Sequence, residues 1–277
     1  MKSALRSSIC ISISFVQALF VAILAILISL LIVLTSQFTV EKIEKSNFSD
    51  LAFAEMTEDL NDLSIPAGLP HDFFNDKLSK TDFKELLISK VNASIRNEDF
   101  TVNVEKIRSD IKRPVEQYII DTLGTSEPVW DEALTQFENE CTTTYLEYLS
   151  PTSFELIFSN FSKIFPIIKI ATFVLSVIIL GLFAFLYKLN SSENFFKFCF
   201  TIFAGAGLIC SVLPLYLLIT DEISRVGIGA LSLYSFVKVF LTDFLWLFVN
   251  FGVLLIIISF IFLGVEIIIS LRKQKAK

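Results

Sequence analysis

The residue types that most often do acid–base or nucleophilic chemistry are few in this sequence. Its one histidine, His71, follows Leu69 and Pro70 and precedes Asp72. A catalytic histidine needs an oriented partner, and a residue in a turn that begins with proline is usually solvated. The sequence also lacks an HExxH pair, paired CxxC motifs, GxSxG and a phosphate-binding glycine loop. We therefore expect no enzymatic activity, no catalytic residue and no cofactor.

Four carboxylates lie close enough in sequence to suggest a calcium site: Glu55, Glu58, Asp59 and Asp62. A dedicated calcium loop needs a glycine at its sharp turn and ligands at alternating positions, and this segment has neither. The four cysteines are too scattered to form a disulfide framework, and only Cys141 lies in the segment that we place outside the membrane. We expect neither a bound metal nor an intrachain disulfide.

Ionisable side chains within apolar runs are candidates for function because lipid penalises charge. Lys169, Lys238 and Asp243 lie near the ends of predicted spans, where they can reach the interface. Glu266 has apolar neighbours on both sides and precedes the basic residues 272–273. Two interpretations stay open. Glu266 is an ion or proton site that faces the helix bundle, or it lies at the inner interface beside the basic tail.

The first apolar run carries small residues at spacings of four, four, three and four, which places them on one helical face. They are Ser14, Ala18, Ala22, Ala25 and Ser29. Small side chains let membrane helices approach closely, so this face is a candidate for packing against another span or another copy. The alternative is a chance stripe, because small residues are common in spans. In the third run, the alternating alanine and glycine residues at 204–207 and Pro214 predict close packing or a kink.

Four long apolar runs must position these side chains. The chain is 53% apolar with a mean hydropathy of +0.66, which is high for a soluble domain. A helix crosses the hydrocarbon core with about 20 apolar residues, and such runs cover residues 9–34, 165–187, 198–219 and 240–269. The first is too long for a signal-peptide core and lacks a small-residue cleavage pattern. Backbone amides in lipid need internal partners, so we predict four transmembrane helices.

Lysine and arginine residues near the spans predict the orientation. Those that fall on one side are Lys2, Arg6, Lys188, Lys197, Arg272, Lys273, Lys275 and Lys277. The other side holds residues 37–166, with 24 acidic against 12 basic residues. We expect a multi-pass plasma-membrane protein with both termini in the cytoplasm. The acidic charge of the large outer segment argues against nucleic acid as a partner.

These signals predict an all-α fold in three parts. Residues 1–36 form the cytoplasmic N-terminus and transmembrane helix 1. Residues 37–164 form an acidic helical extracytoplasmic domain inserted between helices 1 and 2. Residues 165–277 form transmembrane helices 2–4 with a short basic cytoplasmic loop and tail.

Within the predicted outer domain, apolar periodicity indicates several helices. One continues from the first span to near Pro66, and one begins after Thr81 as its cap. Another covers residues 105–123 and is kinked or split at Pro114, and a last one follows Ser126. The face predicted to be apolar on that last helix carries Trp130, Leu134, Phe137, Cys141, Tyr145 and Leu149. Residues 221–239 are too apolar for a solvated loop, so we expect an interfacial amphipathic helix or an outward extension of the fourth span.

A Gly-Leu-Pro turn at 68–70 and the segment TVNVEKI at 101–107 lie in this acidic helical domain, between a single anchor and three closing spans. In this arrangement the chain resembles a loose group of uncharacterised four-span membrane proteins of low-GC Gram-positive bacteria. The resemblance implies the four-span topology and a bacterial plasma membrane. It implies no particular activity.

Three hypotheses for function remain. The first is a non-enzymatic membrane protein whose outer domain binds a membrane or envelope protein or another envelope component. The second is a small transporter or channel subunit that uses Glu266. The third is a sensor that detects a ligand outside and acts through a separate signalling partner. The sequence predicts the lipid bilayer as surroundings and leaves the oligomeric state open.

Overall fold

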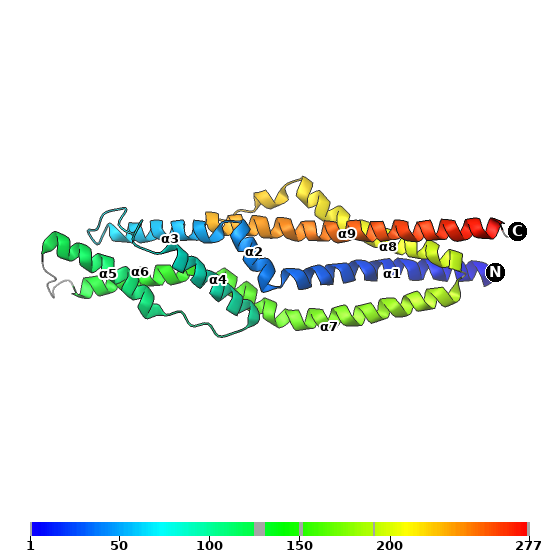
Figure 1. Cartoon of the computed structure of the whole chain (residues 1–277), viewed down its shortest axis with the longest axis horizontal. Coiled ribbons are helices and arrows are strands. Elements are labelled where there is room, and N and C mark those ends of the chain that lie inside the picture. The colour runs from blue at the N-terminus through cyan, green and yellow to red at the C-terminus, as the bar shows by residue number, and fades with distance from the viewer. Residues whose placement is uncertain (1, 125–130, 150–151, 191, 276–277) are drawn as a thin grey trace. The chain divides into compact units, whose positions relative to one another are not determined.

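The computed structural model describes residues 2–124, 131–149, 152–190 and 192–275, and every regular element among these residues is helical (Figure 1). The all-α prediction is therefore confirmed for this part of the chain. The elements are α1 (Lys2–Val33), α2 (Ser36–Lys45), α3 (Phe48–Ser64), α4 (Lys80–Arg96), α5 (Val104–Leu123), α6 (Asp131–Leu149), α7 (Thr152–Leu189), α8 (Ser192–Ile219), the 3-10 helix η2 (Glu222–Arg225) and α9 (Leu231–Lys275).

Four of these helices are long and apolar enough to cross a membrane. The segments concerned are Ser8–Val33, Lys163–Leu189, Asn194–Ile219 and Leu231–Gln274. Large apolar side chains on them stay uncovered, such as Phe173 on α7, which is 71% exposed. Apolar surface of this extent is rare on proteins that live in water. The described chain therefore has the character of a membrane protein with four spans, as predicted.

The chain forms two compact units. The first unit contains Met1–Leu34, Ile164–Val226 and Phe240–Lys277, and the second contains Thr35–Lys163 and Gly227–Val239. The second unit thus takes in residues 227–239, which lie far along the chain from the rest of it. The domain boundaries predicted from the sequence did not include this segment in the outer domain. Its hydrogen bonds join Ser232 to Glu55 and Ser235 to Ser46, and these pairs are separated by 177 and 189 positions in the chain.

The core of the first unit forms where small side chains let helices approach. Ala18, Ala22 and Ala25 of α1 share one buried cluster with Ile202 and Ala206 of α8. The helices α8 and α9 also cross closely, since a Cβ on Gly207 would lie 2.7 Å from the carbonyl oxygen of Gly252. Only glycine permits that approach without displacing backbone, so these two residues define the crossing.

The second unit is built around aromatic side chains from several short helices. The rings of Phe53 on α3 and Tyr145 on α6 both contact the ring of Phe83 on α4, with centroids 5.7 and 5.6 Å apart. Between α3 and α4, Phe74 is fully buried, and its amide donates to the side chain of Asn61 at 2.8 Å. This core gives the unit its own packing, independent of any other part of the chain.

Two local features of the second unit differ from the sequence predictions, and a third decides between two predicted alternatives. The helix expected to reach Pro66 is interrupted at Asn47, whose left-handed φ of 54° separates α2 from α3. The helix α4 is capped by Ser79 and not by Thr81, because the Ser79 hydroxyl accepts from the amide of Asp82. The helix α5 continues through Pro114, so that residue does not split it. The start predicted for the last helix, after Ser126, lies outside the described residues.

The fourth apolar run begins earlier than predicted, because α9 is continuous from Leu231 to Lys275. Its first turns pack within the second unit. Ser235 donates to the carbonyl oxygen of Ser46 at 2.8 Å, and the rings of Phe236 and Phe48 have centroids 5.7 Å apart. Of the two interpretations of residues 221–239, the structure has an extension of the fourth apolar helix from Leu231 onward, whereas the residues before it form η2 and a short non-helical link.

Candidate functional site

The helix α6 of the second unit has one apolar face and one polar face. Phe137, Cys141, Tyr145 and Leu149 are buried, and they recur at the spacing of four that aligns residues on a helix. This is the face that the periodicity predicts, except that Leu134 is half-buried and Trp130 lies outside the described residues. The opposite face is therefore free to carry the polar side chains of the helix.

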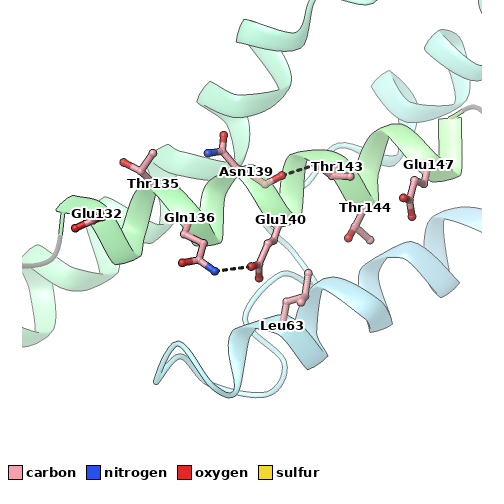
Figure 2. A pocket seen from close by; sticks show the side chains of 9 residues that line it. All are labelled: Leu63, Glu132, Thr135, Gln136, Asn139, Glu140, Thr143, Thr144 and Glu147. Atoms are coloured by element: carbon pink, nitrogen blue, oxygen red, sulfur yellow. Dashed lines mark hydrogen bonds between the residues drawn. The ribbon is translucent and has the colours of Figure 1, made fainter.

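That polar face borders a shallow, open depression of about 850 Å³ beside α3, which we name the α6 trough. Figure 2 shows the polar side chains arranged along α6, with Leu63 on the neighbouring α3. The trough is lined by Leu63, Glu132, Thr135, Gln136, Asn139, Glu140, Thr143, Thr144 and Glu147. Its breadth suits a macromolecular surface better than an enclosed small ligand.

The electrostatics of the trough are acidic. Three carboxylates line it, those of Glu132, Glu140 and Glu147, and its lining contains no lysine or arginine. Gln136 donates to Glu140 at 2.9 Å, and Arg108 of α5 donates to Asn139 at 3.1 Å. The hydrogen bond from the Gln136 side-chain amide orients the Glu140 carboxylate but does not neutralise its charge. The trough consequently presents negative potential to anything that approaches.

A second cavity of about 460 Å³ adjoins the trough and shares Leu63, Gln136 and Glu140 with it. Its remaining lining is largely apolar and includes Val115 and Phe137. An apolar cavity beside an acidic rim can accept one apolar side chain next to cationic neighbours.

Comparison with protein-family models, with curated proteins and with solved structures finds no match to this chain. Function is therefore inferred from the chemistry of the site alone.

The small-residue face named from the sequence lies in the first unit. All five residues are buried: Ser14, Ala18, Ala22, Ala25 and Ser29. The two serines donate to carbonyl oxygens one turn earlier in α1, each at 2.8 Å, so their hydroxyls are satisfied within the helix. Next to this face, Gln17 is fully buried. Its amide nitrogen lies 3.5 Å from the carbonyl oxygen of Ile179 on α7.

Glu266 forms an ion pair with Lys197 of α8, with the two charged groups 3.4 Å apart. Its side chain is only 13% exposed, whereas that of Lys197 is 56% exposed. This ion pair, with one buried and one exposed partner, balances the charge of the Glu266 carboxylate and joins α8 to α9. The other charged residues near span ends have separate surroundings. The ammonium of Lys169 lies over the ring of Phe165 at 4.3 Å, and Lys238 is exposed.

Three of the four carboxylates that suggested calcium have other partners, and the fourth, Glu58, is exposed. Glu55 accepts from both the backbone amide of Ser232, at 3.0 Å, and its hydroxyl. Asp59 accepts from the hydroxyl of Tyr148 at 2.7 Å, and Asp62 lies 3.9 Å from the exposed ring of His71. Among the described residues, no group of three metal-ligating side chains converges. Glu55 is instead a cap for the first turn of α9.

Sequence reasoning did not single out the α6 trough. The sequence does contain a pattern for the polar face that borders the trough, because polar residues recur at 132, 136, 139, 143 and 147, opposite the apolar stripe. A polar helical face usually means solvent, and only the neighbouring α3 makes this one a depression.

Proposed function

We propose that this chain is a non-enzymatic multi-pass protein of a plasma membrane whose second unit lies outside and binds a protein or envelope partner. The observation that carries the proposal is the α6 trough, an open acidic surface that continues into an apolar cavity. The complementary partner is a polypeptide segment with lysine or arginine side chains around one apolar anchor. The outer location follows from the basic residues near the spans, as the positive-inside rule requires.

Photo-crosslinking in intact cells tests the proposal. A photoreactive amino acid at Thr143 lies in the trough, and one at the exposed Glu85 of α4 lies away from it. We expect Thr143 to capture a defined protein product that the Glu85 position does not give.

Charge reversal sharpens the same test. Glu140→Lys with Glu147→Lys should abolish capture, because it turns attraction for a basic partner into repulsion. Glu85→Lys adds lysine on another helix and should leave capture intact. Equal capture from both positions, or capture that survives reversal in the trough, would remove the trough from the function.

A further inference from the structure

A cavity of about 490 Å³ lies between α4 and α5 of the second unit, on the other side of α6 from the trough. Its volume falls in the usual range for small-molecule sites, about 300–1,000 Å³. The cavity shares no lining residue with the α6 trough. A ligand in this cavity is therefore independent of the proposed function of the trough.

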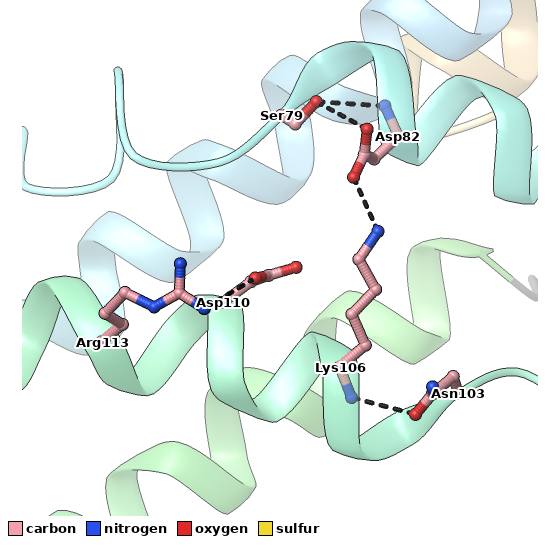
Figure 3. A network of polar contacts seen from close by, with 6 residues as sticks. All are labelled: Ser79, Asp82, Asn103, Lys106, Asp110 and Arg113. Atoms are coloured by element: carbon pink, nitrogen blue, oxygen red, sulfur yellow. Dashed lines mark hydrogen bonds and ion pairs between the residues drawn. The ribbon is translucent and has the colours of Figure 1, made fainter.

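Two ion pairs line this cavity (Figure 3). The ammonium of Lys106 lies 2.9 Å from Asp82, and Arg113 lies 4.0 Å from Asp110. All four side chains are between 42% and 77% exposed. Pairs as exposed as these contribute little to stability, so a ligand can replace either partner at small cost. Asp110 in particular accepts no hydrogen bond from any described residue.

Tyr145 of α6 provides an independent sign of a ligand. The residue is 6% exposed and its ring meets Phe83, yet it lines the cavity. Its hydroxyl makes no hydrogen bond within the part of the chain that the structure describes. Burial, together with the carboxylates of Asp82 and Asp110, raises the pKa of this phenol. A neutral hydroxyl with unused hydrogen-bonding capacity thus lies close to two carboxylates.

We infer that this cavity binds a small zwitterion, a free amino acid or short peptide with an apolar side chain. A ligand ammonium has three N–H donors, and Asp82, Asp110 and Tyr145 supply three oxygen acceptors. When the ligand ammonium replaces Lys106 and Arg113 as the partner of the two aspartates, the ligand carboxylate accepts hydrogen bonds from Lys106 and Arg113.

Charge balance selects a zwitterion over a singly charged ligand. A zwitterion can replace both partners of these pairs, whereas a plain amine can bind only the two aspartates and a plain carboxylate only the two cations. Ser79 and Asn103, which cap the first turns of α4 and α5, also line the cavity.

The rest of the lining accommodates an apolar body. It includes Leu78, Leu86, Ile107 and Pro114. These residues predict that the bound zwitterion carries an aliphatic or aromatic side chain.

Isothermal titration of the full-length protein in lipid nanodiscs tests the inference with three matched probes. L-leucine carries both charges, N-acetyl-L-leucine lacks the ammonium, and L-leucine amide lacks the carboxylate. We expect L-leucine to bind about tenfold or more tightly than either analogue, because charge-assisted hydrogen bonds are lost in each.

Three variants locate the binding. Asp110→Asn should weaken leucine binding about tenfold, and Tyr145→Phe, which keeps the ring against Phe83, by several-fold. Glu105→Gln removes a carboxylate on the same helix whose side chain is 81% exposed and outside the cavity, and should change nothing. Circular dichroism confirms that each variant is folded. The inference is overturned by absence of leucine binding, by equal binding of one analogue, or by wild-type affinity in both cavity variants.

Discussion

Burial suppresses the nucleophilic reactivity of the Cys141 thiol. Its side chain is fully buried in α6, and burial, with smaller effects from Glu140 and Glu138, raises the pKa of the thiol to about 12. The nucleophilic thiolate is therefore absent at neutral pH. We expect an alkylating reagent at pH 8 to modify Cys141 only after the second unit unfolds, and mass spectrometry of the labelled chain checks this.

The same thiol makes stability depend on alkaline pH. Its pKa is raised in the folded state, so its stabilising effect is complete below the unfolded value near 9 and is lost as pH rises toward 12. Relative to Cys141→Ala, the wild-type protein should lose about 1 kcal/mol between pH 8 and pH 10. Unfolding temperatures of both proteins in detergent, followed by fluorescence, give the difference. A pH-independent offset would mean that Cys141 ionises in the folded protein.

At the scale of one element, the first turn of α9 depends on Glu55. The carboxylate of this α3 residue accepts two hydrogen bonds from Ser232, and charge-assisted bonds of this kind are stronger than neutral ones. Glu55→Gln should raise hydrogen exchange at amides 232–236 by about tenfold, measured by mass spectrometry. The matched control is Glu58→Gln, an exposed residue of the same helix. Equal exchange in the two variants would show that Glu55 does not hold the turn.

The crossing of α8 and α9 gives a second test at this scale. A Cβ on Gly252 would collide with the Ser211 hydroxyl and approach the carbonyl oxygen of Gly207 to 2.7 Å, whereas one on Gly264 of the same helix meets nothing within 4 Å. Gly252→Ala should destabilise the first unit by about 1–3 kcal/mol through overpacking. Gly264→Ala should be neutral or slightly stabilising. Unfolding by increasing SDS in mixed micelles compares the two, and similar midpoints would contradict the close crossing.

The elements also show why sequence predicts some features and misses others. The four apolar helices follow from the length of their apolar runs, and the buried face of α6 follows from its periodicity; each segment carries these signals by itself. Ser79 as the cap of α4, two positions before the predicted Thr81, depends on a hydrogen-bond geometry that both hydroxyls allow in principle. The Glu55–Ser232 contact and the α6 trough join distant segments. No local pattern contains such partners.

At the scale of the whole molecule, the two units divide the chain by composition. The first unit is largely apolar, and its few charged residues include the Lys197–Glu266 pair. The second is acidic and packs around aromatic rings such as Phe83. Lipid penalises a charged helical body, so we expect the second unit to lie in water on one side of the membrane. Which side it occupies is decided by the basic residues near the spans.

Cysteine accessibility in intact cells tests that orientation. Glu105→Cys places an exposed thiol on α5, and Gln274→Cys places one near the end of α9. The four native cysteines are buried and contribute little background in the folded protein. We expect a membrane-impermeant maleimide to label Glu105→Cys in intact cells, and to label Gln274→Cys only after permeabilisation. The reason for this expectation is the positive-inside rule, which favours the cytoplasmic side for the span ends that carry Lys188, Lys197 and Arg272. The reverse labelling pattern would place the α6 trough inside the cell and would exclude an envelope partner. Labelling of both thiols in intact cells would contradict the number of spans predicted between residues 105 and 274.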